Sequence, residues 1–136
     1  MTGDDIALSW VLASRRPEQL ARFYADLLGT NPKPGVATHH WIVPLQGQGS
    51  LQIYTPSRKR PWPASGSALA PCLQRRAKAD PLLELQAWHQ HVIQLGGRST
   101  EEPRLESFGA ECWLEDPEGQ SFLLLVFRPE SSERTI

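Results

Sequence analysis

The sequence predicts an α+β fold in which one βαβββ unit occurs twice. Apolar residues recur at helical spacing over residues 20–28 and again over residues 82–95, and glycines end both runs. Each helical run follows one strand-like segment and precedes about three more. Because one helix covers only one face of a sheet, two such units are expected to pair into a curved mixed-sheet cup that can hold a ligand. A plain α+β sandwich is the alternative arrangement of the same elements.

The first unit is expected to begin with a strand over residues 6–13, where bulky and smaller side chains alternate. Ser14 is expected to cap the helix that follows, and Pro17 suits the first turn of that helix. The prolines and glycine of residues 32–35 predict a loop.

Two more strands are predicted over residues 39–45 and 50–55, with a glycine-rich turn between them. Pro44 within the first of these points to an edge strand or a bulge. A proline-rich, basic stretch then predicts a linker at about residues 57–69.

The second unit is expected to repeat the first. A weakly alternating segment over residues 70–77 predicts its opening strand, and Asp80 followed by Pro81 predicts the start of its helix. The remaining strands are predicted near residues 98–100, 110–114 and 121–127. We therefore expect a single domain, residues 1–136, with modules at about residues 5–56 and 70–128.

Composition excludes several classes of protein. The 136 residues carry a formal net charge of -1, which gives no general attraction to nucleic acid or to a membrane surface. The longest apolar run, residues 122–127, is far shorter than the roughly 20 residues that span a bilayer. Cys72 and Cys112 are too few for a disulfide framework and are expected to be free thiols. We expect a cytoplasmic protein.

Two motifs carry a family resemblance. Residues 20–29 read LARFYADLLG, and residues 114–123 read LEDPEGQSFL, a tight turn between strands. With the duplicated layout between them, the chain resembles the vicinal oxygen chelate superfamily, which includes glyoxalase I, extradiol dioxygenases and bleomycin-resistance proteins. The resemblance covers about residues 6–127 and implies the glyoxalase-like cup of duplicated βαβββ modules.

Metal-dependent members of that superfamily hold a divalent ion with four His, Glu or Gln side chains inside the cup. Counting from the motifs places Ser9, Gln52, either Cys72 or Gln74, and Leu123 at those four positions. Serine is a poor ligand, leucine has no donor atom, and glutamine is weak without stronger partners. We therefore expect no metal and no other cofactor.

No other pattern indicates a catalytic group. His39 and His40 are adjacent on a predicted strand and should point to opposite faces, and His89 and His91 are two apart on a helix. No glycine-flanked serine elbow is present, so the catalytic residues, if any, stay unassigned.

The remaining lining of the cup is expected to be aromatic and aliphatic with a few polar groups. Such a lining is typical of a small-molecule site. The expected ligand-binding residues are Ser9, Trp41, Gln52, Tyr54, Glu111, Trp113 and Leu123.

Three functions remain open. The first is a metal-independent small-molecule binding protein of the bleomycin-resistance type, which is the function we favour. The second is an enzyme of this fold, a lyase, isomerase or dioxygenase, with an altered metal site. The third is an interaction module whose pocket is filled. The resemblance also implies a homodimer, because members of this fold commonly pair modules across a two-fold axis.

Overall fold

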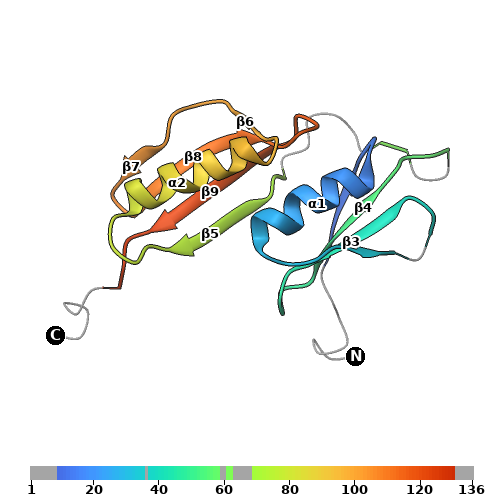
Figure 1. Ribbon diagram of the computed structural model, residues 1–136, viewed down its shortest axis with the longest axis horizontal. Helices are drawn as coiled ribbons and strands as arrows, with labels where there is room; N and C mark the ends of the chain where they lie inside the picture. Colours follow the sequence, from blue (N-terminus) through green and yellow to red (C-terminus); the bar gives the residue numbers. More distant parts are fainter. Residues whose placement is uncertain (1–8, 36, 59–60, 63–68, 131–136) are drawn as a thin grey trace. The chain divides into compact units, whose positions relative to one another are not determined.

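The computed structural model describes residues 9–35, 37–58, 61–62 and 69–130. The chain divides into two compact units, unit 1 at Met1–Ser67 and unit 2 at Ala68–Ile136. Each unit holds one long helix and a mixed sheet (Figure 1). The predicted α+β fold with a repeated strand and helix pattern is confirmed.

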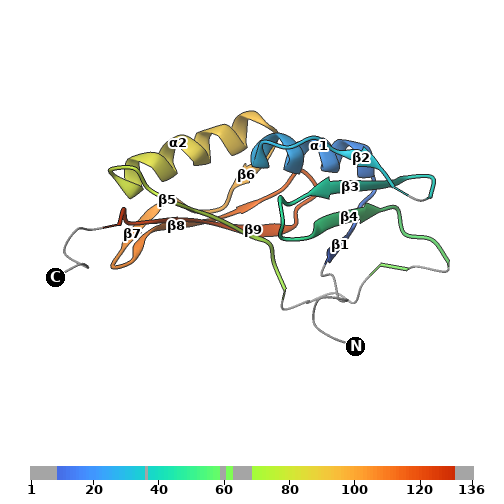
Figure 2. The ribbon, with the colours of Figure 1, turned by 90° about the horizontal axis from the view of Figure 1, so that it is seen from below.

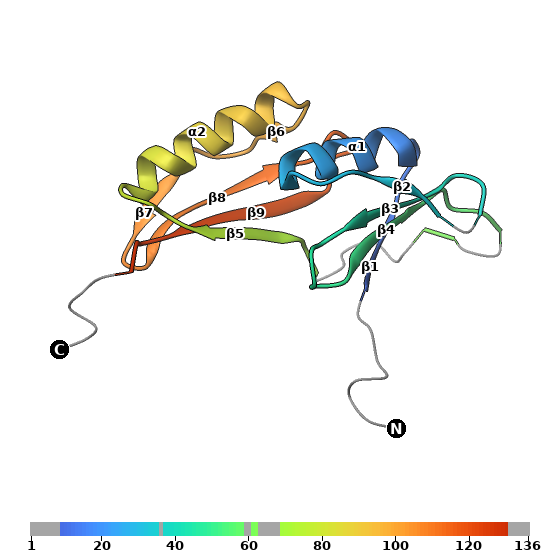
Figure 3. The same ribbon diagram turned by 60° about the horizontal axis from the view of Figure 1, so that its bottom comes forward.

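Unit 1 contains a four-stranded sheet in the order β1-β4-β3-β2. Its central strands are β4 (Ser50–Tyr54) and β3 (His40–Pro44), which run antiparallel to each other. β1 (Ser9–Ala13) pairs in parallel with β4, so the first and last strands of the unit lie side by side (Figure 3). Residues 6–8 of the predicted first strand lie outside the described residues.

The short strand β2 (Lys33–Pro34) replaces the loop that the sequence predicts at residues 32–35. It pairs with Ile42 and Trp41 of β3 at the edge of the sheet. A proline is tolerated there because an edge strand has one side that needs no backbone donor. The prolines therefore mark an edge strand as well as a loop.

Helix α1 (Pro17–Leu28) covers one face of the unit 1 sheet (Figure 2). The expectation that Ser14 caps it is wrong, because the N-cap position is Arg16 and has no side-chain cap. Ser14 instead accepts a hydrogen bond from the Arg16 N–H, 3.0 Å away. Gly29 ends the helix at φ 72, a left-handed conformation that glycine adopts at little cost. The buried residues between helix and sheet are Leu20, Phe23, Tyr24, Val43, Leu51 and Ile53.

Unit 2 has the matching arrangement with a longer sheet, in the order β5-β9-β8-β6. β5 (Cys72–Arg76) pairs in parallel with β9 (Ser121–Phe127), and β9 pairs antiparallel with β8 (Gly109–Glu115). The other edge of β8 carries two short strands, β6 (Arg98–Ser99) and β7 (Arg104–Glu106). The sequence did not predict β7.

Helix α2 (Pro81–Gln94) covers one face of the unit 2 sheet, above β8 and β9 (Figure 2). Asp80 caps it as predicted, since its Oδ1 accepts the N–H groups of Leu82 and Leu83 at 3.0 and 3.2 Å. None of the described helices is long and apolar enough to cross a membrane. The buried residues beneath the helix are Leu85, Trp88, Val92, Cys112, Leu114, Phe122, Leu124 and Val126.

The turn between β8 and β9 is organised by Asp116, which is fully buried. Its Oδ1 accepts the backbone N–H groups of Glu118 at 2.8 Å and Gln120 at 3.0 Å. Gly119 adopts φ 88, the left-handed conformation that the tight turn requires. The second sequence motif thus fixes the connection between the two central strands of unit 2.

Candidate functional site

Each sheet has a face that its own helix does not cover, and we call this the helix-free face. Strand pairing assigns the side chains, because directly paired residues point to the same side of a sheet. The helix-free face of unit 1 carries Ser9, Val11, Ala13, His40, Ile42, Pro44, Ser50, Gln52 and Tyr54. The helix-free face of unit 2 includes Cys72, Gln74, Arg76, Glu111, Trp113, Leu123, Leu125 and Phe127.

Six of the seven predicted ligand-binding residues therefore lie on helix-free faces. Ser9, Gln52 and Tyr54 share that of unit 1. Glu111, Trp113 and Leu123 share that of unit 2, where Trp113 pairs directly with Leu123.

Trp41 is the exception: it was expected to join the cup lining, but it does not share the face of Gln52. It pairs with Ile53, a fully buried residue beneath α1, so it lies on the helix side of the sheet. No local sequence pattern determines the strand register of β3, and a shift of one residue moves a side chain to the opposite face.

Gln52 belongs to a hydrogen-bonded row on the helix-free face of unit 1. The Nε2 atom of His40 lies 2.7 Å from Oε1 of Gln52, and Nε2 of Gln52 donates to Oγ of Ser50 at 2.8 Å. Sequence reasoning missed His40 as a functional residue. The available signal was the expectation that His39 and His40 point to opposite sides; His39 precedes β3 with φ 61 and lines the groove at the start of α1.

Tyr54 lies on the same face and is oriented through its hydroxyl group. That hydroxyl donates a hydrogen bond of 3.2 Å to the carbonyl oxygen of Pro61. Among the side chains that strand pairing places on this face, none is a carboxylate, and Lys33 at its edge is positively charged. The face therefore offers hydrogen bonds in a neutral to weakly positive setting.

Trp113 presents its ring on the helix-free face of unit 2, where its exposed fraction is 39%. Its backbone lies in the gap between β6 and β7, where β8 has no neighbouring strand on that edge. Two side chains fill the gap. Oε2 of Glu101 accepts the Trp113 N–H at 2.8 Å, and Oγ1 of Thr100 donates to the Trp113 carbonyl oxygen at 2.9 Å.

Arg104 joins three carboxylates beside Trp113. It pairs with Glu101, with Glu106 at 3.4 Å and with Glu111 at 2.9 Å. The hydrogen bond from the Trp113 N–H is the larger cause, and the hydrogen bond from Arg104 the smaller one, that hold the pKa of Glu101 below its usual value. The carboxylates in turn raise the pKa of Arg104. Both charges are therefore retained across the physiological pH range, which fixes the Trp113 segment.

The side chains at the four counted metal positions do not fit a divalent ion. The amide of Gln52 is already bonded to His40 and Ser50, and Leu123 has no donor atom. Although Cys72 as a residue is exposed, partial desolvation of its thiol, with the charge of Glu111 nearby, raises the pKa of that thiol and so disfavours the thiolate that binds metal. Within the described residues, no group of three His, Cys, Asp or Glu side chains could hold a metal.

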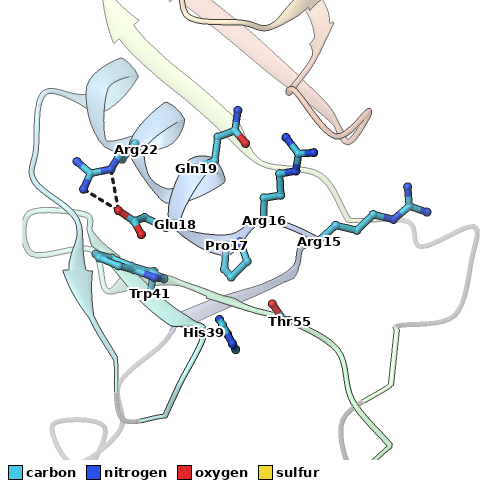
Figure 4. Close-up of a pocket in the computed structure, with 9 residues that line it drawn as sticks. All are labelled: Arg15, Arg16, Pro17, Glu18, Gln19, Arg22, His39, Trp41 and Thr55. Carbon is cyan, nitrogen blue, oxygen red and sulfur yellow. Dashed lines mark hydrogen bonds and ion pairs between the residues drawn. The ribbon is translucent and has the colours of Figure 1, made fainter.

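A groove of about 560 Å³ lies on the helix side of unit 1, at the start of α1 (Figure 4). Trp41, His39 and Pro17 line it, and Glu18 is paired with Arg22 at 2.8 Å. Its other lining residues are Arg15, Arg16, Gln19 and Thr55. Figure 4 shows the guanidinium groups of Arg15 and Arg16 pointing away from Trp41, so they do not converge on one ligand position.

The chain belongs to the glyoxalase-like domain family, whose family model matches residues 9–125. The match spans both units and both sequence motifs. No curated protein sequence matches the chain.

Solved structures share the fold at low sequence identity. A glyoxalase/bleomycin resistance protein from Albidiferax ferrireducens is 26% identical with a TM-score of 0.59, over 90% of this chain and 98% of that one. A glyoxalase/bleomycin resistance protein/dioxygenase family enzyme from Burkholderia phytofirmans is 12% identical with a TM-score of 0.66, over 88% and 96%. Lactoylglutathione lyase from Agrobacterium tumefaciens is 16% identical with a TM-score of 0.57, over 92% and 96%. The vicinal oxygen chelate resemblance is thereby confirmed for the fold.

Proposed function

We propose that this protein binds a small organic molecule without a metal ion, and that the helix-free sheet faces supply the contacts. The observation that carries the proposal is the set of side chains at the counted metal positions. Gln52 is engaged in a side-chain network and Leu123 has no ligating atom, so the metal chemistry of the superfamily lacks its donors.

The residues on these faces suit a small organic ligand. Trp113 and Leu123 supply aromatic and aliphatic surface, while Ser9, Gln52, Tyr54 and Glu111 supply hydrogen-bonding groups. Trp41 is not part of this proposal, because it lies on the helix side of its sheet.

A fragment screen observed by NMR tests the proposal. Flat aromatic fragments are expected to shift resonances of the helix-free faces, and Trp113→Ala should weaken that binding by about tenfold or more through the lost aromatic contact. Trp10→Ala is the matched control, because Trp10 is 41% exposed and points to the opposite side of its strand from Ser9. If no fragment shifts either face, the binding function is excluded and an interaction module is favoured.

Elemental analysis of the purified protein separates binding from metal-dependent catalysis. We expect less than one equivalent of zinc, nickel, manganese or iron per chain. One tightly held equivalent whose loss follows Gln52→Ala would instead support an enzyme with an altered metal site.

We further propose a cytoplasmic homodimer with the two modules and linker predicted from the sequence. Support comes from unpaired Cys72 and Cys112 and from apolar surface at Leu105 and Phe108, which are 54% and 40% exposed. Sedimentation at micromolar concentration is expected to give twice the 15.2 kDa mass of the chain. A single monomeric species would contradict the dimer.

A further inference from the structure

His40 holds the side chain on which the proposed ligand site of unit 1 depends. Its ring lies 2.7 Å from the Gln52 amide oxygen, across strands β3 and β4. The contact is diagonal, because His40 pairs with Tyr54 while Gln52 pairs with Ile42. A diagonal contact between long side chains on one face is within reach in antiparallel sheets.

The His40 ring packs closely against the backbone of Gly35. A Cβ atom added to Gly35 would lie 2.2 Å from Nδ1 of His40, so only glycine at that position accommodates the ring as it stands. The Gly35 N–H also donates to the His40 carbonyl oxygen at 2.7 Å. His40 is therefore held from the edge strand side as well as by Gln52.

The orientation of the Gln52 amide sets the direction of the hydrogen-bond row. Nε2 of Gln52 donates to Ser50, which turns Oε1 of Gln52 toward His40. An amide oxygen only accepts, so Nε2 of His40 must carry a hydrogen. One N–H of the Gln52 amide is used by Ser50, and the second has no acceptor among the described residues.

We propose that His40 is a positioning residue that fixes the Gln52 amide, and that the ligand presents a carbonyl or carboxylate oxygen to the second Gln52 N–H. This inference rests on the proposed small-molecule binding function and narrows its ligand class. The lack of a carboxylate among the paired side chains of this face, and Lys33 at its edge, favour an acceptor oxygen over a cationic group.

Three probes with the same ring system test the ligand class on the full chain. Naphthoate and acetylnaphthalene each present an acceptor oxygen, whereas naphthylmethylammonium presents only donors. The two acceptors are expected to shift the Gln52 side-chain amide resonances and to bind about fivefold to tenfold more tightly than the ammonium. Equal affinity of all three, or no shift at Gln52, would overturn the inference while leaving small-molecule binding intact.

Variants test the role of His40 itself. His40→Ala should remove most of the preference for acceptor probes, and His40→Gln, which retains an N–H donor, should restore part of it. His39→Asn is the control, because His39 lies on the opposite side of the sheet and asparagine tolerates its φ of 61. An unchanged preference in His40→Ala would show that His40 does not position the amide.

A spectroscopic measurement decides the direction of the row without any ligand. Nitrogen NMR of the imidazole is expected to show the Nε2–H tautomer for His40. In Gln52→Leu, which lacks the accepting amide oxygen, the preference for this tautomer should decrease. A dominant Nδ1–H form would mean that the row runs the other way and would overturn the assignment. If no probe binds either helix-free face, the proposed function fails and the ligand class fails with it.

Discussion

The Trp113 N–H and the Glu101 carboxylate are 2.8 Å apart and together complete the edge of β8. Strand β6 ends opposite Leu114 and strand β7 begins opposite Glu111, so the backbone between them has no neighbouring strand on that side. The carboxylate takes the place of a strand carbonyl. These contacts fix the backbone of Trp113, although the residue is partly exposed.

Acid should weaken this edge. The pKa of Glu101 is lowered in the folded protein by the Trp113 N–H and then by Arg104, so the ionised form favours folding. That stabilisation is present above the ordinary glutamate pKa of about 4.3 and is lost as the pH falls through the lower folded pKa. Glu101→Gln should lower the free energy of unfolding by about 1 kcal/mol at neutral pH. Urea unfolding from pH 7 to pH 2 checks this. The difference in the free energy of unfolding between Glu101→Gln and the parent should disappear at the acid end of this range.

Substitution of Trp113 should cost little stability. Trp113 is 39% exposed, whereas Trp88 beneath α2 is 8% exposed. We expect Trp113→Ala to lower the free energy of unfolding by about 1 kcal/mol, and Trp88→Ala to lower it by about 3–5 kcal/mol. Urea titrations of both variants provide the measurement. Equal losses would show that Trp113 is a core residue and not a candidate for ligand contact.

The buried carboxylate of Asp116 should be important for folding. Asp116→Ala leaves the Glu118 and Gln120 N–H groups without their acceptor, at a cost of about 2–4 kcal/mol. Asp116→Asn retains an acceptor oxygen and should cost less than the alanine variant. Thermal unfolding of the pair distinguishes the loss of the acceptor from the loss of charge, and a larger loss in the asparagine variant would assign the effect to charge.

The two thiols should react at very different rates. Cys72 is exposed, while Cys112 is buried, and burial together with the Glu101 charge raises the pKa of Cys112 to about 12. A disulfide reagent at pH 8 should therefore modify one thiol in the folded protein and the second only after unfolding. Cys72→Ser should abolish the first phase. Absence of any free thiol in the unreduced, unfolded chain would instead reveal a disulfide.

The sequence predicted the helices and most strands because their signals are local. Gly29 and the Asp80 cap mark helix ends through backbone geometry that involves only nearby residues. Strand β7 was missed because it has three residues and pairs only at the edge of β8. No short-range pattern distinguishes such a segment from a loop.

The site was predicted unevenly for a related reason. Glu111 and Trp113, two of the expected lining residues, lie on the opposite side of β8 from the buried Cys112 and Leu114, as strand alternation requires. Trp41 was assigned to the wrong face because its orientation depends on the register with β4, which is a long-range property. The same register creates the contact between His40 and Gln52, residues 12 positions apart.

The parallel pairing of first and last strands sets the order in which a growing chain can complete each unit. The sheet of unit 1 needs only residues up to Tyr54, because the pairing partner of β1 is β4, which ends at that residue. The sheet of unit 2 cannot close until β9 has left the ribosome, because β5 lies beside a strand that ends at Phe127. Unit 1 can thus acquire its strand pairing while unit 2 is still being synthesised, whereas the β5 edge stays unpaired until Phe127 has been translated. A ribosome-stalled chain ending before β9 should therefore carry an exposed β5 edge that chaperones can bind.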